Sequence, residues 1–207
     1  MNPSARRPPD DGGRAPWARV AGVTVAVLAL SACLHPTFGY LADPGDGFAL
    51  RYPRSWDEVR ADPFGSEWVG AVDAASTPSA QHLQTYAVDA PFLLAQVQRL
   101  TPAEADTYTL AQLRQLANPD HVDPTQVTDG SVRMQFNDPI LTDQGFEGHH
   151  LRFDLDQDGK TVRVEHFAAL SPDRATLYRV RVACLVSCFE RNRADIEDVF
   201  DSIDLRR

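Results

Sequence analysis

Residues 145–170, GFEGHHLRFDLDQDGKTVRVEHFAAL, decide the fold because they fit a β-hairpin in a single register. Apolar and polar residues alternate on both sides of Asp158-Gly159, a pair typical of two-residue hairpin turns. With the turn at this pair, two pairs of opposite charges form on one face, and the other face is largely apolar. The polar pairs are Asp154 with Arg163 and Arg152 with Glu165; on the other face Leu151 meets His166, Phe153 meets Val164 and Leu155 meets Val162.

Turn and capping signals extend this pattern over the rest of the chain. Thr101-Pro102-Ala103-Glu104 is a capping box with proline in the first turn, which predicts a helix after it. Ser187-Cys188-Phe189-Glu190 predicts a second helix, covering about 188–203. We expect strands at 48–53, 67–74, 82–88, 92–100, 132–136, 145–156, 161–170 and 177–184. This order predicts an α+β fold, with an antiparallel β-sheet and flanking helices.

Two segments near the ends of the predicted domain resemble the PsbP-like superfamily. Phe48-Ala-Leu-Arg-Tyr-Pro53-Arg-Ser-Trp56 resembles its opening, where a strand runs into Tyr-Pro and a tryptophan. Phe200-Asp-Ser-Ile-Asp-Leu205 resembles the end of its last helix and its final short strand. In style the chain is most similar to the LpqN-type lipoproteins of actinobacteria. The resemblance implies one α/β/α sandwich domain over 48–207 and a binding or assembly role, and it supplies no catalytic residue.

The N-terminal segment predicts a lipoprotein signal peptide over residues 1–32. Arginines precede an apolar run from Val20 to Leu30, which is too short to cross a bilayer as a helix and is typical of a signal-peptide core. Leu30-Ser-Ala-Cys33 follows directly and resembles the bacterial lipobox, whose cysteine is diacylated before cleavage. We therefore expect lipidation at Cys33, a tether over 33–47 and a lipid-anchored protein on the extracytoplasmic face of the cell membrane.

The other two cysteines also favour an exported protein. Once Cys33 is lipidated, Cys184 and Cys188 form an even pair, as expected in an oxidising compartment. On a straight strand their Cα atoms would be ~13 Å apart, too far for a disulfide. A bridge needs the chain to turn between them, and a helix start is predicted there. The sequence therefore favours a Cys184–Cys188 disulfide, with two buried thiols as the alternative.

Composition and motifs limit the possible functions. The 207 residues carry a net charge of -9, which disfavours nucleic-acid binding because phosphate contacts need a basic surface. The sequence has no Gly-x-Ser-x-Gly elbow, HExxH, Walker loop or dinucleotide-binding glycine motif. We therefore expect a non-enzymatic protein without a cofactor, which binds an envelope protein or a small ligand. An envelope enzyme with a dispersed site is the alternative from another class.

Two groups of residues have side chains that bind metal ions in other proteins. One matches the spacing of an EF-hand calcium loop, although strands flank it where such loops have helices. Two histidines, His149 and His166, share the apolar face of the hairpin, with Glu147 beyond them, and could bind zinc. We favour the hairpin over calcium and a half-buried histidine pair over zinc, so a metal-stabilised module stays an alternative. The calcium candidates are Asp154, Asp156, Asp158 and Glu165.

Arginines on the predicted sheet are the candidate ligand site. Arg152 and Arg163 lie on the polar face of the hairpin. If the next hairpin pairs odd-numbered with odd-numbered residues, Arg179 and Arg181 join the same face. Four guanidinium groups would then outnumber the nearby acids and could hold a phosphate or carboxylate by forked hydrogen bonds. A network of surface ion pairs is the simpler interpretation of the same residues.

Overall fold

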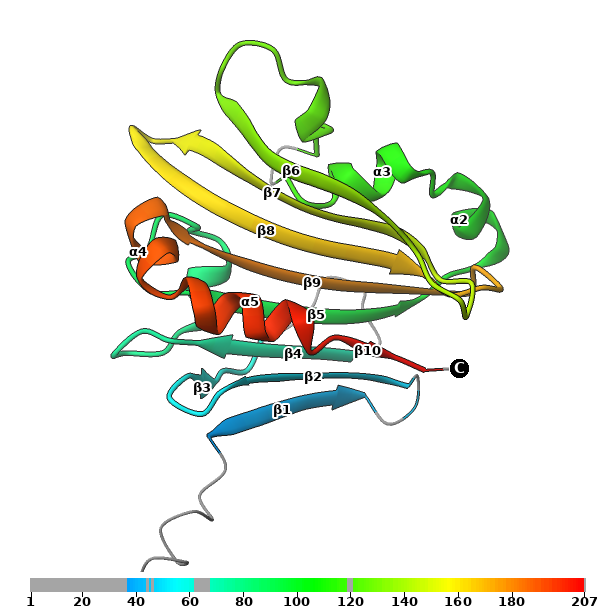
Figure 1. Ribbon diagram of the computed structural model, residues 1–207, viewed down its shortest axis with the longest axis horizontal. Helices are drawn as coiled ribbons and strands as arrows, with labels where there is room; N and C mark the ends of the chain where they lie inside the picture. The colour runs from blue at the N-terminus through cyan, green and yellow to red at the C-terminus, as the bar shows by residue number, and fades with distance from the viewer. Residues whose placement is uncertain (1–36, 44, 46, 62–67, 119–120, 207) are drawn as a thin grey trace, which may run out of the picture. The chain divides into compact units, whose positions relative to one another are not determined.

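The computed structural model describes residues 37–43, 45, 47–61, 68–118 and 121–206 (Figure 1). The predicted signal peptide, the lipobox and Cys33 lie outside these ranges. Within them, no helix is long and apolar enough to cross a membrane.

Seven antiparallel strands form the main sheet, in the order β3-β4-β5-β9-β8-β7-β6. A second, three-stranded antiparallel sheet has the order β1-β2-β10. These sheets and the helices beside them make the fold α+β, as predicted. The main-sheet strands are β3 (Asp57–Glu58), β4 (Trp68–Asp73), β5 (Phe92–Arg99), β6 (Val132–Leu141), β7 (Glu147–Gln157), β8 (Lys160–Leu170) and β9 (Thr176–Leu185); the small sheet has β1 (Phe38–Asp43), β2 (Phe48–Pro53) and β10 (Asp204–Leu205).

Helices cover both faces of the main sheet (Figure 1). On one face α4 (Val186–Arg191) and α5 (Arg193–Asp201) pack with the small sheet around the largest apolar core, which includes Phe48, Val180 and Phe189. On the opposite face α2 (Pro102–Thr107) and α3 (Leu110–Gln115) pack over Ala168 and Leu177. Two short 3-10 helices, η2 (Ala80–Leu83) and η3 (Pro124–Gln126), complete the connections.

The predicted hairpin register is confirmed residue by residue. Asp154 pairs with Arg163, Arg152 with Glu165 and Leu155 with Val162 along β7 and β8. Asp158 and Gly159 at the turn have φ angles of 50° and 74°. Positive φ at both positions is the geometry that a two-residue turn of type I′ requires. A two-residue turn of this kind fixes which residues face each other, so the local sequence determined the register.

Three predicted secondary-structure elements were wrong, in each case because local contacts outweigh the apolar pattern. Residues 82–88 are not a strand: residues 82–83 end η2, whose start is capped by the Ser79 side chain, and 84–88 follow it. The helix after Thr101 has its predicted capping box but ends at Thr107, and a second box at Thr109 starts α3. The final helix is broken at Asn192, and α4 begins at Val186 without the predicted Ser187 capping box.

The predicted tether is also shorter than expected. Residues Phe38–Asp43 form β1, which pairs with β2 along its whole length. Leu41 is buried in the main core, and the Arg51 guanidinium lies 4.7 Å from the centre of the Phe38 ring. A Cβ atom on Gly39 would come within 2.3 Å of the Tyr52 ring, so any larger residue here would require this ring to move. The folded part therefore begins upstream of the conspicuous 48–56 segment.

The Cys184–Cys188 disulfide is present where β9 turns into α4. The two Cα atoms lie 6.0 Å apart, within the usual range for a bridge, and both side chains are buried. The helix start at Val186 provides the turn that the bridge needs.

Candidate functional site

The pairing of β8 with β9 decides where the predicted arginine site lies. It places Arg163 opposite Cys184 and His166 opposite Arg181, so odd-numbered residues pair with even-numbered ones. Arg179 and Arg181 therefore lie on the face that carries α2 and α3, away from Arg152 and Arg163. The prediction that the four arginines share one face was wrong. The prediction assumed that odd-numbered residues of β8 pair with odd-numbered residues of β9. The connection after Leu170 instead brings Leu177 opposite Leu170, so even-numbered residues pair with odd-numbered ones.

Arg152 and Arg163 are neutralised by acids between the sheet and α4. Arg163 donates from Nε to Asp154 Oδ1 at 2.6 Å and also contacts Glu190. Arg152 donates from Nε to Glu165 Oε2 at 2.8 Å. Both guanidinium groups lie over the Phe189 ring. These contacts give the two arginines a structural role in joining α4 to the sheet.

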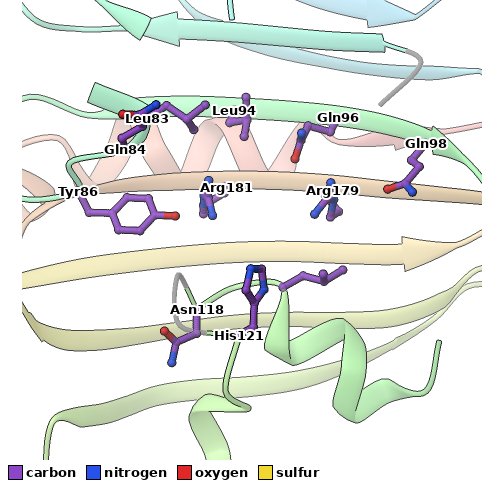
Figure 2. Close-up of a pocket in the computed structure, with 11 residues that line it drawn as sticks. Leu83, Gln84, Tyr86, Leu94, Gln96, Gln98, Asn118, His121, Arg179 and Arg181 are labelled. Carbon is purple, nitrogen blue, oxygen red and sulfur yellow. The ribbon is translucent and has the colours of Figure 1, made fainter. Parts of the chain in front are cut away.

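Arg179 and Arg181 instead line a cavity of about 560 Å³ (Figure 2). They alternate along β9 and stand opposite Gln96 and Leu94 of β5. The remaining wall comes from the segment after η2 and from the chain after α3. No carboxylate is among the described residues that line the cavity, which are Leu83, Gln84, Tyr86, Leu94, Gln96, Gln98, Leu116, Asn118, His121, Arg179 and Arg181.

The two cavity arginines have no ion pair with any described residue. Arg181 lies over the Tyr86 ring, 4.8 Å from its centre. The Nε atom of Arg179 is buried and has no hydrogen-bond partner. Burial and the charge of Arg181 lower the pKa of Arg179 to about 10. Arg179 therefore stays cationic at neutral pH, and an anion in the cavity would relieve the unfavourable burial of its charge.

The two histidines that were candidates for zinc lie on the same face of the sheet as the cavity arginines. The rings of His149 and His166 are 5.4 Å apart and both are buried. Burial lowers the pKa of His149 to about 4; burial and the nearby charged groups hold the pKa of His166 well below its usual value. Glu147 is exposed, and its Oε2 atom lies 3.9 Å from Nη1 of Arg174. In the described ranges no three metal-ligating side chains come together.

The calcium candidates lie in the hairpin and its turn, and not in a loop between helices. Asp154 is paired with Arg163, and Asp156 with Arg133 at 2.9 Å. Glu165 is buried between Arg152 and His150, and Asp158 lies at the turn. The three acids in the strands already bind cationic side chains or His150, so ion pairing explains their positions without a metal ion.

Sequence reasoning missed an Asp–His pair beside the cavity. His82 Nδ1 lies 2.6 Å from Asp73 Oδ2, and the buried Asp73 also accepts hydrogen bonds from the backbone of Ala75 and Ser79. A carboxylate that orients a histidine also occurs in hydrolase triads. In the described chain, however, no hydroxyl or thiol side chain is hydrogen-bonded to His82. The pair holds in place the segment that contributes Leu83 and Gln84 to the cavity wall. No motif in the sequence predicts this pair.

The architecture is that of PsbP-like proteins, and comparison with solved structures agrees. The chain is similar to a cyanobacterial PsbP (CyanoP) from Synechocystis. The match covers 84% of this chain and 96% of the other, with 12% identity and a TM-score of 0.52. The chain is also similar to LpqN, a protein involved in cell envelope biogenesis of Mycobacterium tuberculosis, over 83% of this chain and 93% of that one, with 12% identity and a TM-score of 0.50.

The remaining comparisons add no function. A solved protein from Bacteroides thetaiotaomicron matches 83% of this chain over 50% of its own length, with 9% identity and a TM-score of 0.46. No family model matches the sequence, and no curated protein does. At such identities the likeness establishes the PsbP-like fold alone, and fold does not determine function.

Proposed function

We propose that this chain is a lipid-anchored protein of the cell envelope whose PsbP-like domain is a non-enzymatic binding module for a small anionic ligand. The ligand occupies the cavity lined by Arg179 and Arg181. The single observation that carries this proposal is the pair of guanidinium groups that no described carboxylate neutralises, in a protein of net charge -9.

The cavity has the size of a small-molecule site. Its volume of about 560 Å³ lies within the usual range for ligand pockets, which is roughly 300–1,000 Å³. Its described lining has more polar than apolar residues, which suits a charged ligand. Two arginines that converge on one space are suited to bind phosphate or carboxylate, because each guanidinium presents a planar fork of donors.

The location rests on the N-terminal sequence and on a structural neighbour. The lipobox Leu30–Cys33 predicts a diacylated cysteine on the extracytoplasmic face of the membrane. The similar protein LpqN is involved in cell envelope biogenesis, which supports the same compartment for this chain. The disulfide between Cys184 and Cys188 is in keeping with an oxidising environment.

A thermal-shift experiment tests the proposal with full-length protein purified from its own membrane. Phosphate, sulfate and acetate are the probes. We expect at least one of them to raise the melting temperature of the wild type but not of the Arg179→Gln/Arg181→Gln variant, since binding to the folded state stabilises it. Arg193→Gln is the matched control, because Arg193 is an exposed arginine on α5, across the sheet from the cavity. Equal shifts in all three proteins, or no shift in any, would contradict the proposal.

A further inference from the structure

The cavity has a polar end and an apolar end, and strand register sets this division. Alternate residues of β5 face the cavity in the order Leu94, Gln96, Gln98. On β9, Arg181 stands opposite Leu94, and Arg179 stands opposite Gln96. Figure 2 shows the same order, with Leu94 toward one end of the cavity and Gln98 toward the other. The polarity of the wall therefore changes along the strands.

At the polar end, Arg179 lies beside two side-chain amides. Side chains directly opposite each other on antiparallel strands have Cβ atoms about 4.5–5.5 Å apart, which applies to Arg179 and Gln96. Gln98 stands on the diagonal. A guanidinium donates hydrogen bonds, whereas an amide both donates and accepts them. This end is therefore suited to an anionic group and to a hydroxyl or ester oxygen attached to it.

At the other end, called the apolar end, Leu83, Leu94 and the Tyr86 ring line the wall, and Gln84 lies beside Leu83 (Figure 2). The Arg181 guanidinium lies over the Tyr86 ring, which holds this arginine at the boundary between the two ends. Leu83 keeps part of its surface exposed, whereas Tyr86 and Leu94 are only 6% and 5% exposed. A carbon skeleton placed here would cover what remains exposed and would remove its own apolar surface from water, which is favourable in proportion to the apolar area covered.

We infer that the ligand is an organic anion with two dissimilar ends: a charged group bound by Arg179 beside Gln96 and Gln98, and an apolar or aromatic body against Leu83, Tyr86 and Leu94. The inference rests on the proposed function and adds the chemical class of the ligand. A small oxyanion by itself would contact only the polar end of the cavity.

Calorimetric titration of the full-length protein in lipid nanodiscs tests this class, with empty nanodiscs as the blank. The probes are inorganic phosphate, phenyl phosphate and the neutral phenyl glucoside. We expect phenyl phosphate to bind about tenfold or more tightly than inorganic phosphate, because it also buries a ring. Phenyl glucoside should bind more weakly than phenyl phosphate, since it lacks the anionic group.

Two variants separate the two ends of the cavity. Arg179→Gln should weaken the binding of both phosphates by about tenfold or more, because it removes a charge-assisted contact. Leu83→Ser should weaken the binding of phenyl phosphate several-fold and leave the binding of inorganic phosphate unchanged. Arg193→Gln, with the same loss of charge outside the cavity, should change neither. Far-UV circular dichroism of each variant shows whether the fold is kept.

The possible outcomes separate this inference from the proposed function. If both phosphates bind equally well and both depend on Arg179, the anion site stands and the two-ended ligand is wrong. If phenyl glucoside binds as tightly as phenyl phosphate, or if Arg179→Gln leaves phosphate binding unchanged, the anionic ligand itself is wrong. If no probe binds the wild type, both are overturned.

Discussion

Glu165 is a buried carboxylate that holds two neighbouring side chains on the sheet face under α4 and α5. It accepts a hydrogen bond from Arg152 and lies 2.8 Å from His150, with its side chain only 1% exposed. Glu165→Gln would leave the Arg152 charge buried and poorly compensated. We expect the free energy of unfolding to fall by about 2–4 kcal/mol, measured by urea denaturation.

Glu197→Gln is the control: Glu197 lies 3.7 Å from the same arginine but is 48% exposed, so the loss should stay below about 1 kcal/mol. Equal losses would show that burial of Glu165 is unimportant.

His149 makes the stability of the fold depend on pH. Burial lowers its pKa to about 4 in the folded state, whereas the unfolded chain takes up the proton near pH 6.5. Between these values the unfolded state binds more protons, so stability falls as the pH drops from about 6.5 to about 4. The loss assigned to His149 is up to about 3 kcal/mol, and His166 adds to it in the same direction.

The variant His149→Leu tests this pH dependence. Leucine stays neutral at every pH, so the decline of unfolding free energy between pH 6.5 and 4 should be shallower than in the wild type. Urea denaturation at a series of pH values measures the slope. A wild-type slope in His149→Leu would refute the assignment.

At the scale of elements, the sequence predicted those parts of the fold in which a few local residues set the geometry. The Asp158-Gly159 turn fixes both its backbone angles and its register, so the β7–β8 pairing followed from the sequence. The β8–β9 connection has no such signal, and Arg174 within it takes a φ of 58°. One residue of difference in that connection moved Arg179 and Arg181 to the opposite face. Only Arg179 and Arg181 of the four predicted arginines therefore line the cavity, on the face opposite to Arg152 and Arg163.

The Cys184–Cys188 bridge joins β9 to α4 through a very short loop. The chain-entropy model gives about 2 kcal/mol for closing a loop of this length. We expect the Cys184→Ala/Cys188→Ala variant to lose about that free energy of unfolding, measured by urea denaturation. Dithiothreitol should destabilise the wild type similarly and leave the double variant unchanged. Mass spectrometry of non-reduced peptides from natively exported protein gives a direct check, and free thiols at both positions would refute the bridge.

At the scale of the whole molecule, the cavity brings together segments far apart in the chain. Tyr86 follows η2, Gln96 lies on β5, Asn118 follows α3 and Arg181 lies on β9. None of these residues belongs to a motif, because a site assembled by tertiary packing leaves no fixed spacing in the sequence. The sequence therefore predicted the fold class and named two of the arginines that line the cavity, but only the three-dimensional packing could locate the cavity.

The anchor can be tested independently of the cavity, because Cys33 lies upstream of every described strand. The thiol of Cys33 is the predicted acyl acceptor, and the first described residue is Thr37. We expect Cys33→Ala to abolish incorporation of radiolabelled palmitate. The domain should nonetheless fold normally, since the strands of both sheets pair among residues 38–205. The variant should keep the wild-type melting temperature and the phosphate response of the cavity.

Cys184→Ala/Cys188→Ala is the matched control, which removes thiols but should keep full labelling. Palmitate incorporation at the wild-type level in Cys33→Ala would show that position 33 is not the lipid attachment site.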